Sequence, residues 1–327
     1  MSGVLVVFEH RGGNWSRTSW EALAAGQALA AGSGEPLMTA ALGADLGTLQ
    51  PEMAAKKASR GYLVQHELLR NYTSDGYVLA LEQLIRKIEP SFVVFPHTYQ
   101  VRDFGPRLAT RFDEVLVADV IGLSTDGETP VFVRQLLQGK LNADYRHLGP
   151  GPRFISVQAG AFRADMLEAG STEIETFAPQ LDASAIRTKP SEPFRESAQT
   201  VDLSSAPIIV SVGRGIKEQD NLPMIEELAQ ALGAEIAASR PICDNGWLPM
   251  ERQVGSSGQT VSPKLYVAVG ISGAIQHLVG MKGSKTIVAI NKDENAPIFE
   301  VADYGIVGDL FEIVPALSAA VQKAKQS

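Results

Sequence analysis

Residues 265–278, LYVAVGISGAIQHL, join an apolar strand to a helix through a glycine-containing turn. We predict that Ser272 caps a helix that begins at Gly273. Such a turn leaves backbone N–H groups unpaired at a helix N-terminus, where an anionic group can bind. Gln276 and His277 are predicted to face the same ligand; the alternative is a buried His277 whose ring is satisfied by the protein. The turn lacks the GxGxxG pattern, so the standard dinucleotide fingerprint is absent.

On both sides of this turn, short β-branched runs alternate with stretches rich in alanine and leucine. Strands that alternate with helices predict a parallel sheet covered by helices. We expect strands over 3–8, 93–97, 207–215, 235–239, 265–270, 285–291 and 304–308. We expect helices over 16–31, 79–89, 103–112 (capped by Asp103), 219–232, 273–281 and 309–324. A run of strands over 115–123, 129–137 and 153–158 predicts an antiparallel addition to the first sheet.

The strand and helix pattern is interrupted over residues 160–205, which contain several prolines and many Glu, Ser and Thr residues. We interpret this stretch as a surface connection between two domains. The fold class predicted is α/β, with two doubly wound, mostly parallel-sheet domains, the second of them Rossmann-like. The predicted boundaries are an N-terminal domain over 1–190, a linker over 191–205 and a C-terminal domain over 206–327.

Composition and charge limit the kinds of partner that this chain can bind. The 327 residues are 45% hydrophobic, include one cysteine and carry a formal net charge of −8. An acidic chain without a basic arm argues against nucleic-acid binding, and one cysteine cannot form an internal disulfide. No apolar run approaches the roughly 20 residues that span a bilayer. The N-terminus has no basic segment typical of a secretory signal, so we expect a cytoplasmic protein without an integral membrane segment.

Further polar residues follow other predicted strands of the second domain. VGRGI (212–216) supplies Arg214, SRPICDNGWLP (239–249) supplies Ser239 and Arg240, and VGSSG (254–258) supplies two serines. Carboxyl ends of parallel strands are where such sheets bind ligands, and glycines there let backbone approach closely. The alternatives are a tight turn, a structural ion pair and a flexible loop, respectively.

Two later predicted strands also end in polar residues that could bind a ligand. The first domain has fewer such candidates. Asn291 closes a strand and suits a ribose or phosphate, whereas Asp309 either caps the last helix or binds a nucleotide. In the first domain, HTYQVRD (97–103) looks like an emptied nucleotide site or an interface. We find no Ser–His–Asp order, no metal-ligand spacing and no phosphate-binding P-loop motif in the sequence.

Residues 269–310, VGISGAIQHLVGMKGSKTIVAINKDENAPIFEVADYGIVGDL, resemble the signature region of the electron-transfer flavoprotein alpha subunit. The resemblance extends back through VGRGI, SRPICDNGWLP and VGSSG, and more weakly through VLVVFEHRGG near the N-terminus. It implies one FAD, with Arg240 over the isoalloxazine ring, Ser257 at ring nitrogen N5 and His277 near O2. The full set of cofactor-binding residues implied is Arg214, Ser239, Arg240, Val254, Gly255, Ser256, Ser257, Ser272, Gly273, Ala274, Ile275, Gln276, His277, Asn291, Asp309 and Leu310. The family usually has Gln-Thr where this chain has Ser256-Ser257.

The resemblance also implies partners and a role as an electron carrier rather than an enzyme with its own substrate. The partner expected is the beta subunit, which carries AMP or a second FAD. Donors are flavoprotein dehydrogenases, such as acyl-CoA dehydrogenases of fatty acid beta-oxidation, and the acceptor is a membrane quinone oxidoreductase or another protein. Electrons would pass through an anionic flavin semiquinone. The alternatives are an electron-bifurcating alpha subunit, a flavin- or NAD-dependent dehydrogenase, and a nucleotide-binding subunit without redox activity.

Overall fold

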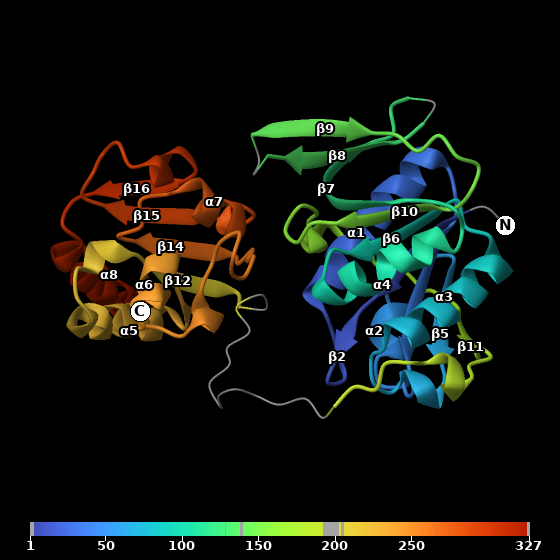
Figure 1. Cartoon of the computed structure of the whole chain (residues 1–327). Helices are drawn as coiled ribbons and strands as arrows, with labels where there is room; N and C mark the ends of the chain where they lie inside the picture. The colour runs from blue at the N-terminus through green and yellow to red at the C-terminus, as the bar shows by residue number, and fades with distance from the viewer. Residues whose placement is uncertain (1–2, 128, 138–139, 192–202, 204–205, 326–327) are drawn as a thin grey trace. The chain divides into compact units, whose positions relative to one another are not determined.

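The computed structural model describes residues 3–127, 129–137, 140–191, 203 and 206–325 (Figure 1). The chain divides into two compact units, residues 1–193 and 194–327, called unit 1 and unit 2 below. Each unit contains a largely or wholly parallel sheet of its own, which confirms the predicted α/β fold class. The predicted linker lies outside the described residues, except for residues 191 and 203.

The sheet of unit 1 has the strand order β11-β5-β4-β1-β6-β10-β7-β8-β9, and β2 pairs with β3 separately. Its strands are β1 (Val4–Phe8), β2 (His10–Arg11), β3 (Asn14–Trp15), β4 (Leu37–Gly43), β5 (Arg60–Gln65), β6 (Phe92–Pro96), β7 (Leu116–Ser124), β8 (Val131–Leu136), β9 (Leu141–Tyr145), β10 (Arg153–Val157) and β11 (Ile174–Phe177). Its helices are α1 (Arg17–Ser33), α2 (Gln50–Ala54), α3 (Ser74–Ile88) and α4 (Tyr99–Thr110), with 3-10 turns η1 (Glu67–Leu69), η2 (Ala164–Met166) and η3 (Ala183–Ala185).

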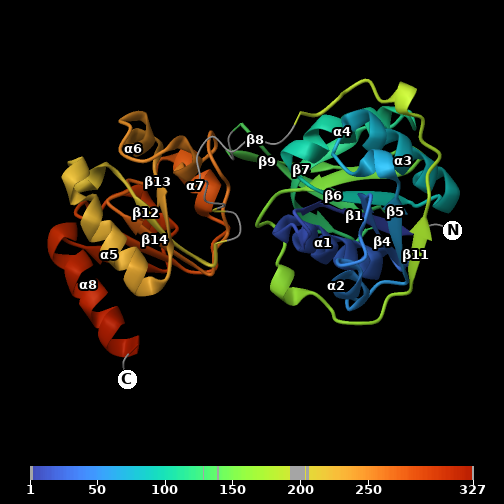
Figure 2. The same cartoon turned by 90° about the horizontal axis from the view of Figure 1, so that it is seen from below.

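Helices cover both faces of the unit 1 sheet (Figure 2). Successive side chains of a strand point to opposite faces. Val6 therefore packs in the cluster that contains Leu23 of α1, and Val7 packs in the cluster that contains Phe104 of α4. The central strands are buried on both faces, which is the environment that selects continuous apolar runs such as VLVVF.

The helix predicted over 103–112 begins earlier than expected. α4 starts at Tyr99, because the Thr98 hydroxyl accepts a hydrogen bond from the Val101 backbone N–H at 3.2 Å and caps the helix. Asp103 was predicted as the cap, but it lies within α4 and accepts a hydrogen bond from the Tyr72 hydroxyl at 2.6 Å. Pro106 accordingly lies inside the helix rather than in its first turn.

The stretch read as a surface connection is partly built into the sheet of unit 1. β11 pairs in parallel with β5 and forms one edge of the sheet. The antiparallel addition predicted over 115–158 is correct for β7, β8 and β9. It is wrong for β10, which returns to the sheet and pairs in parallel with both β6 and β7. A single strand pattern does not encode its direction, so only the pairing reveals it.

All neighbouring strands of the unit 2 sheet are parallel, in the order β13-β12-β14-β15-β16. The strands are β12 (Ile208–Val212), β13 (Glu235–Ala238), β14 (Leu265–Val269), β15 (Ile287–Asn291) and β16 (Tyr304–Val307). The helices are α5 (Leu222–Leu232), α6 (Arg240–Asp244), α7 (Ile275–Met281) and α8 (Leu310–Lys325), with 3-10 turns η4 (Arg214–Ile216), η5 (Gln219–Asn221), η6 (Met250–Arg252) and η7 (Pro297–Glu300).

The order of the unit 2 strands places a topological switch point in the middle of the sheet. The first strand, β12, lies between β13 and β14, so the chain leaves it in one direction and later continues in the other. Such switch points leave a crevice outside the carboxyl ends of the two strands, where ligands of α/β sheets bind. In unit 2 the switch point lies between β12 and β14.

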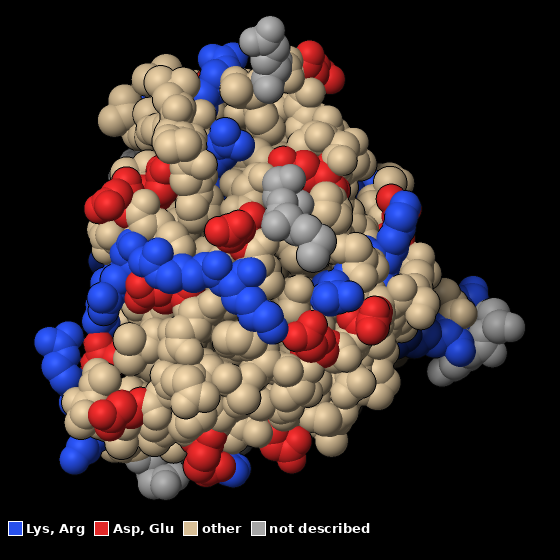
Figure 3. All heavy atoms as spheres, turned by 90° about the vertical axis from the view of Figure 1, so that its right-hand side faces the viewer, with Lys and Arg blue, Asp and Glu red and all other residues tan. Residues whose placement is uncertain are grey.

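Helix lengths and surface charge bear on membranes and nucleic acids. Among the described residues, no helix is long and apolar enough to cross a bilayer. On the face of the molecule drawn in Figure 3, Asp and Glu side chains lie beside the Lys and Arg side chains.

Candidate functional site

The turns that follow β12 and β14 contact each other at the switch point. The Gly213 N–H donates to the Val269 carbonyl at 2.9 Å, and the Gly215 N–H donates to the Gly270 carbonyl at 3.0 Å. A Cβ on Gly215 would lie 2.6 Å from the Gly270 Cα, and Gly270 has a φ of +63°. The sequence interpretation assigned this close approach to a ligand. In the structure, these glycines allow the backbones of the two neighbouring turns to come close to each other.

The strands of the unit 2 sheet are drawn in Figure 1, and most of the predicted site residues stand at or just after the carboxyl ends of these strands. The 254–257 loop joins this edge because the Val254 N–H donates to the Ala238 carbonyl at the end of β13, at 2.9 Å. By element, Arg214 follows β12; Ser239 and Arg240 follow β13; Ser272, Gly273, Ala274, Ile275, Gln276 and His277 follow β14; Asn291 ends β15; and Asp309 and Leu310 follow β16. Successive strands thus bring residues nearly 100 positions apart in the chain to one edge.

The turn after β14 differs from its prediction. α7 begins at Ile275, and its N-cap, Ala274, has no side-chain acceptor, so Ser272 does not cap the helix. The reason lies at Gly273, whose φ of +85° cannot belong to a right-handed helix. A Cβ at this position would collide with the backbone of Ile298, whose N–H donates to the Ser272 carbonyl at 3.1 Å. The Ser272 side chain is exposed at the edge.

The side chains of Gln276 and His277 do not face the same way. Gln276 is exposed, whereas His277 is 6% exposed and its Nε2 lies 2.9 Å from the Tyr266 hydroxyl. Consecutive helical residues point about 100° apart, which explains the difference. Burial lowers the pKa of His277 to about 4, so its ring is neutral at pH 7. The ring therefore adopts the protein-satisfied arrangement, with Nε2 at the Tyr266 hydroxyl and a hydrogen bond to the Val254 backbone that partly opposes the effect of burial on the pKa.

The 253–259 loop is closed by a residue that the sequence did not single out. Gln253 is 1% exposed, and its Nε2 donates to the Ser257 Oγ at 2.9 Å. The Ser256 N–H donates to the Gln276 carbonyl at 2.7 Å, which ties the loop to α7. Ser256 and Ser257 are themselves exposed. A glutamine before a Gly-Ser turn carries no signal in the sequence, because only the folded loop brings its amide to Ser257.

The charged and amide side chains at this edge differ in how far they are exposed and in whether they already bond to other protein groups. The Arg240 side chain is 66% exposed, with its Nε 3.3 Å from the Asp244 Oδ2. Arg214 is exposed on η4. The Asn291 Nδ2 donates to the Ile271 carbonyl at 2.9 Å and so braces the turn after β14. Asp309 accepts from the Phe311 N–H at 3.0 Å, which is the capping role that formed one of its two interpretations.

This edge fits a ligand that is both anionic and rich in hydrogen-bonding groups. Gln253 Oε1 is a buried polar atom without a hydrogen-bond partner in the described part of the chain. Leaving such a group unpaired costs about 1–3 kcal/mol, so a ligand that pairs with it regains that energy. Arg214 and Arg240 add two exposed cations. A dinucleotide, with its phosphates and polar ring edges, matches these features.

The corresponding edge of unit 1 is filled by the protein itself. The Thr98 hydroxyl, at the start of α4, donates to the Glu9 carboxylate at 2.6 Å. Burial raises the pKa of Glu9, although the Thr98 hydrogen bond opposes this. The neighbouring His97 Nδ1 lies 2.9 Å from the Ser156 Oγ. An internal carboxylate therefore stands beside the helix N-terminus where a sheet of this kind would place a phosphate.

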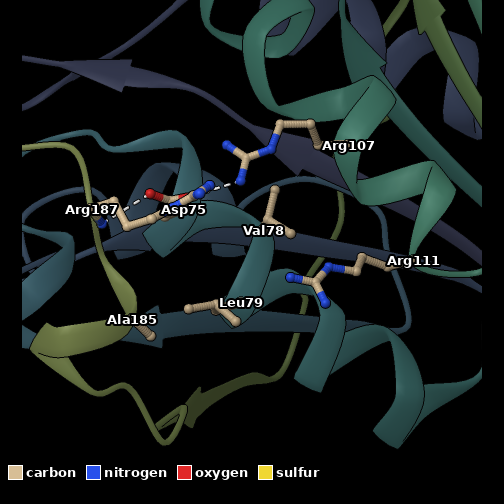
Figure 4. Close-up of a pocket in the computed structure, with 7 residues that line it drawn as sticks. All are labelled: Asp75, Val78, Leu79, Arg107, Arg111, Ala185 and Arg187. Carbon is tan, nitrogen blue, oxygen red and sulfur yellow. Dashed lines mark hydrogen bonds and ion pairs between the residues drawn. The ribbon is translucent and has the colours of Figure 1, made fainter.

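A separate cavity of about 320 Å³ lies between α3 and α4 (Figure 4). Its lining includes three arginines and Asp75, whose carboxylate accepts from Arg107 at 2.5 Å and from the Arg187 backbone N–H at 3.0 Å. The Arg107 hydrogen bond is the largest cause that lowers the pKa of Asp75, to about 2. The ion pairs hold residues 183–187 against α3, so the cluster secures the chain where it leaves the unit 1 core.

Comparison with known proteins identifies two matched regions. Residues 4–182 match the electron transfer flavoprotein domain, and residues 202–282 match the electron transfer flavoprotein FAD-binding domain. The cofactor of the second region is therefore FAD.

Several relatives are similar over nearly their whole length. The chain is 38% identical over 324 residues to the electron transfer flavoprotein subunit alpha of Thermoanaerobacterium thermosaccharolyticum, covering 98% of each chain. It is 39% identical over 321 residues to the subunit of the same name from Bacillus subtilis, covering 96% of each. It is 35% identical over 356 residues to a protein of Anaerotignum propionicum named acryloyl-CoA reductase electron transfer subunit beta, covering 99% of this chain and 96% of that one.

Proposed function

This chain belongs to the electron-transfer flavoprotein alpha-subunit family, and from that premise we propose that it is the FAD-carrying subunit of a heterodimeric electron carrier. Its partner is the beta subunit of the same family, which holds AMP or a second FAD. In this proposal the domain over residues 1–190 contacts the partner, residues 191–205 are the linker, and the domain over residues 206–327 holds FAD. The carrier has no substrate turnover of its own and works in the cytoplasm.

FAD is held along the carboxyl edge of the unit 2 sheet. When bound, FAD supplies chemistry that accepts and releases electrons one or two at a time. Arg240 places a fixed positive charge beside the ring, which favours added electrons. The neutral His277 ring lies near O2 of the flavin, and Ser257 offers its hydroxyl to N5. Arg214, Asn291, Asp309 and Leu310 hold the phosphate and adenosine end, and the rest of the predicted set lines the space between.

The donors proposed are flavoprotein dehydrogenases, such as the acyl-CoA dehydrogenases of fatty acid beta-oxidation. The acceptor is a membrane quinone oxidoreductase or another redox protein. One relative is named as the electron transfer subunit of acryloyl-CoA reductase, which supports a partner enzyme that acts on acyl-CoA compounds. The acidic chain, of net charge −8, suits docking to basic patches on such partners.

One observation carries the proposal, namely that the predicted residues follow the carboxyl ends of parallel strands in one sheet, whose β12, β13 and β14 lie within the matched FAD-binding domain. The experiment is co-expression with the beta subunit, purification of the complex, and measurement of FAD and AMP per heterodimer. We expect one FAD that is reduced by an acyl-CoA dehydrogenase with its substrate. A colourless complex would overturn the proposal. So would turnover of a small substrate by this chain without a partner protein.

The same measurement separates the two kinds of carrier within the family. A non-bifurcating complex contains one FAD and one AMP. An electron-bifurcating complex contains a second FAD in place of AMP. The second site would belong to the partner, so the count per heterodimer decides between them.

A further inference from the structure

Gln253 is held more rigidly than any exposed loop glutamine would be. It follows η6, its side chain is 1% exposed, and its carbonyl accepts from the Gln259 N–H at 2.8 Å. Gly258 packs directly against the Gln253 backbone, where a Cβ would collide with it. The Gly255 N–H donates to the Gln259 carbonyl at 3.1 Å, which closes the loop a second time. The Gln253 amide is therefore fixed relative to the loop that carries Ser257.

The contact between Gln253 and Ser257 has a direction. The amide Nε2 can only donate, so the Ser257 Oγ accepts this hydrogen bond at 2.9 Å. The hydrogen of the Ser257 hydroxyl must then point elsewhere, and Ser257 is exposed toward the edge of the sheet. A hydroxyl that accepts one hydrogen bond becomes a stronger donor in the next. Gln253 thereby orients the Ser257 hydroxyl so that its hydrogen is available to a ligand at the edge of the sheet.

We propose that Gln253 is a positioning residue that makes Ser257 a hydrogen-bond donor to N5 of the flavin ring and so raises the potential at which FAD takes its first electron. This inference rests on the proposed function, in which Ser257 contacts N5. Ring nitrogen N5 of oxidised flavin has a lone pair and no hydrogen, so it accepts. Added electron density makes N5 a better acceptor, and a fixed donor therefore favours the more reduced state.

The experiment uses the FAD-loaded heterodimer and measures the first one-electron potential of FAD by spectroelectrochemistry. Gln253→Met keeps the volume and removes the donor. We expect it to shift the equilibrium between oxidised and one-electron-reduced FAD about tenfold toward the oxidised form, or about 59 mV for a one-electron couple. Gln259→Met is the matched control, because the Gln259 side chain donates to the Glu251 carbonyl in the same loop rather than to Ser257. We expect no shift for it.

A double-mutant cycle tests whether Gln253 acts through Ser257. In a Ser257→Ala background, Gln253→Met should leave the potential unchanged. An equal shift in both backgrounds would overturn the proposal, as would no shift in either. If Gln253→Met does not fold, Gln253→Glu replaces it, because a carboxylate accepts the Ser257 hydrogen and removes the donor from N5.

A second readout does not depend on electron transfer. The ¹⁵N chemical shift of N5 in enriched FAD reports its hydrogen bond directly, and Gln253→Met should move it in the direction that Ser257→Ala does. An N5 shift unaffected by both variants would refute the contact. Loss of FAD from the wild-type complex would instead refute the proposed function, so the two failures are distinguishable by FAD content.

Discussion

His277 makes the stability of unit 2 depend on pH between about 4 and 6.5. The ring is 6% exposed, and burial lowers its pKa from 6.5 to about 4. In this window the unfolded chain binds a proton that the folded chain does not, so stability is full above pH 6.5 and falls as the pH drops toward 4. Each pKa unit is worth about 1.4 kcal/mol, which makes the total loss roughly 3 kcal/mol.

The assay is urea unfolding of the protein freed of FAD, at a series of pH values, beside the variant His277→Gln. Glutamine does not titrate and can still accept from the Tyr266 hydroxyl, which lies 2.9 Å from His277. Other groups also titrate: burial raises the pKa of Glu9 and Glu21 in unit 1, which stabilises the folded state toward acid. The difference between the two proteins removes these contributions. Parallel stability curves for both proteins would refute the reasoning.

Three further changes test other parts of the structure. Gly270→Ala should lower the free energy of unfolding by about 2–4 kcal/mol, since φ is +63° and the neighbouring turn crowds the site. Gly246→Ala, at φ +72° in open space, is the control and should lower it by about 1 kcal/mol. Thermal unfolding measures both. Arg240→Ala should lower the midpoint potential of bound FAD while Arg240→Lys largely retains it, and equal potentials in all three proteins would contradict the assigned charge effect. Asp75→Asn should lower the stability of unit 1 by about 1–2 kcal/mol and speed limited proteolysis near Arg187, whose backbone N–H it binds; an unchanged cleavage rate would count against the clamp.

Much of the unit 2 fold follows from local patterns. The runs that became β14 and β15 are apolar and β-branched, and each is followed by a helical stretch or turn within a few residues. Strands of that kind pair in parallel because the crossover helices must cover both faces. Most of the residues predicted for the site also stand at or just after a strand end, as the strand pattern had indicated.

Unit 1 was harder to predict for a physical reason. β4 contains two alanines and only one β-branched residue, and β9 is largely exposed at the sheet edge, so neither shows a buried β-branched run. β11 belongs to the sheet only through its pairing with β5, far away in the chain. Local composition does not reveal pairing between strands so far apart in the chain. The sequence over 160–205 was therefore interpreted as a connection between domains.

The linear order of residues was sufficient for the α/β class and for the strand ends that carry polar groups, whereas the roles of Arg240 and Ser257 at the flavin stay predictions. It could not settle which way a side chain turns within a helix or loop. His277 points inward to Tyr266 because α7 packs back against the preceding strand β14, and Gln253 reaches Ser257 because the loop between them turns back on itself. The glycines of the turns likewise allow close contacts between turns. Such a contact involves two segments, so the sequence of one segment alone does not reveal it.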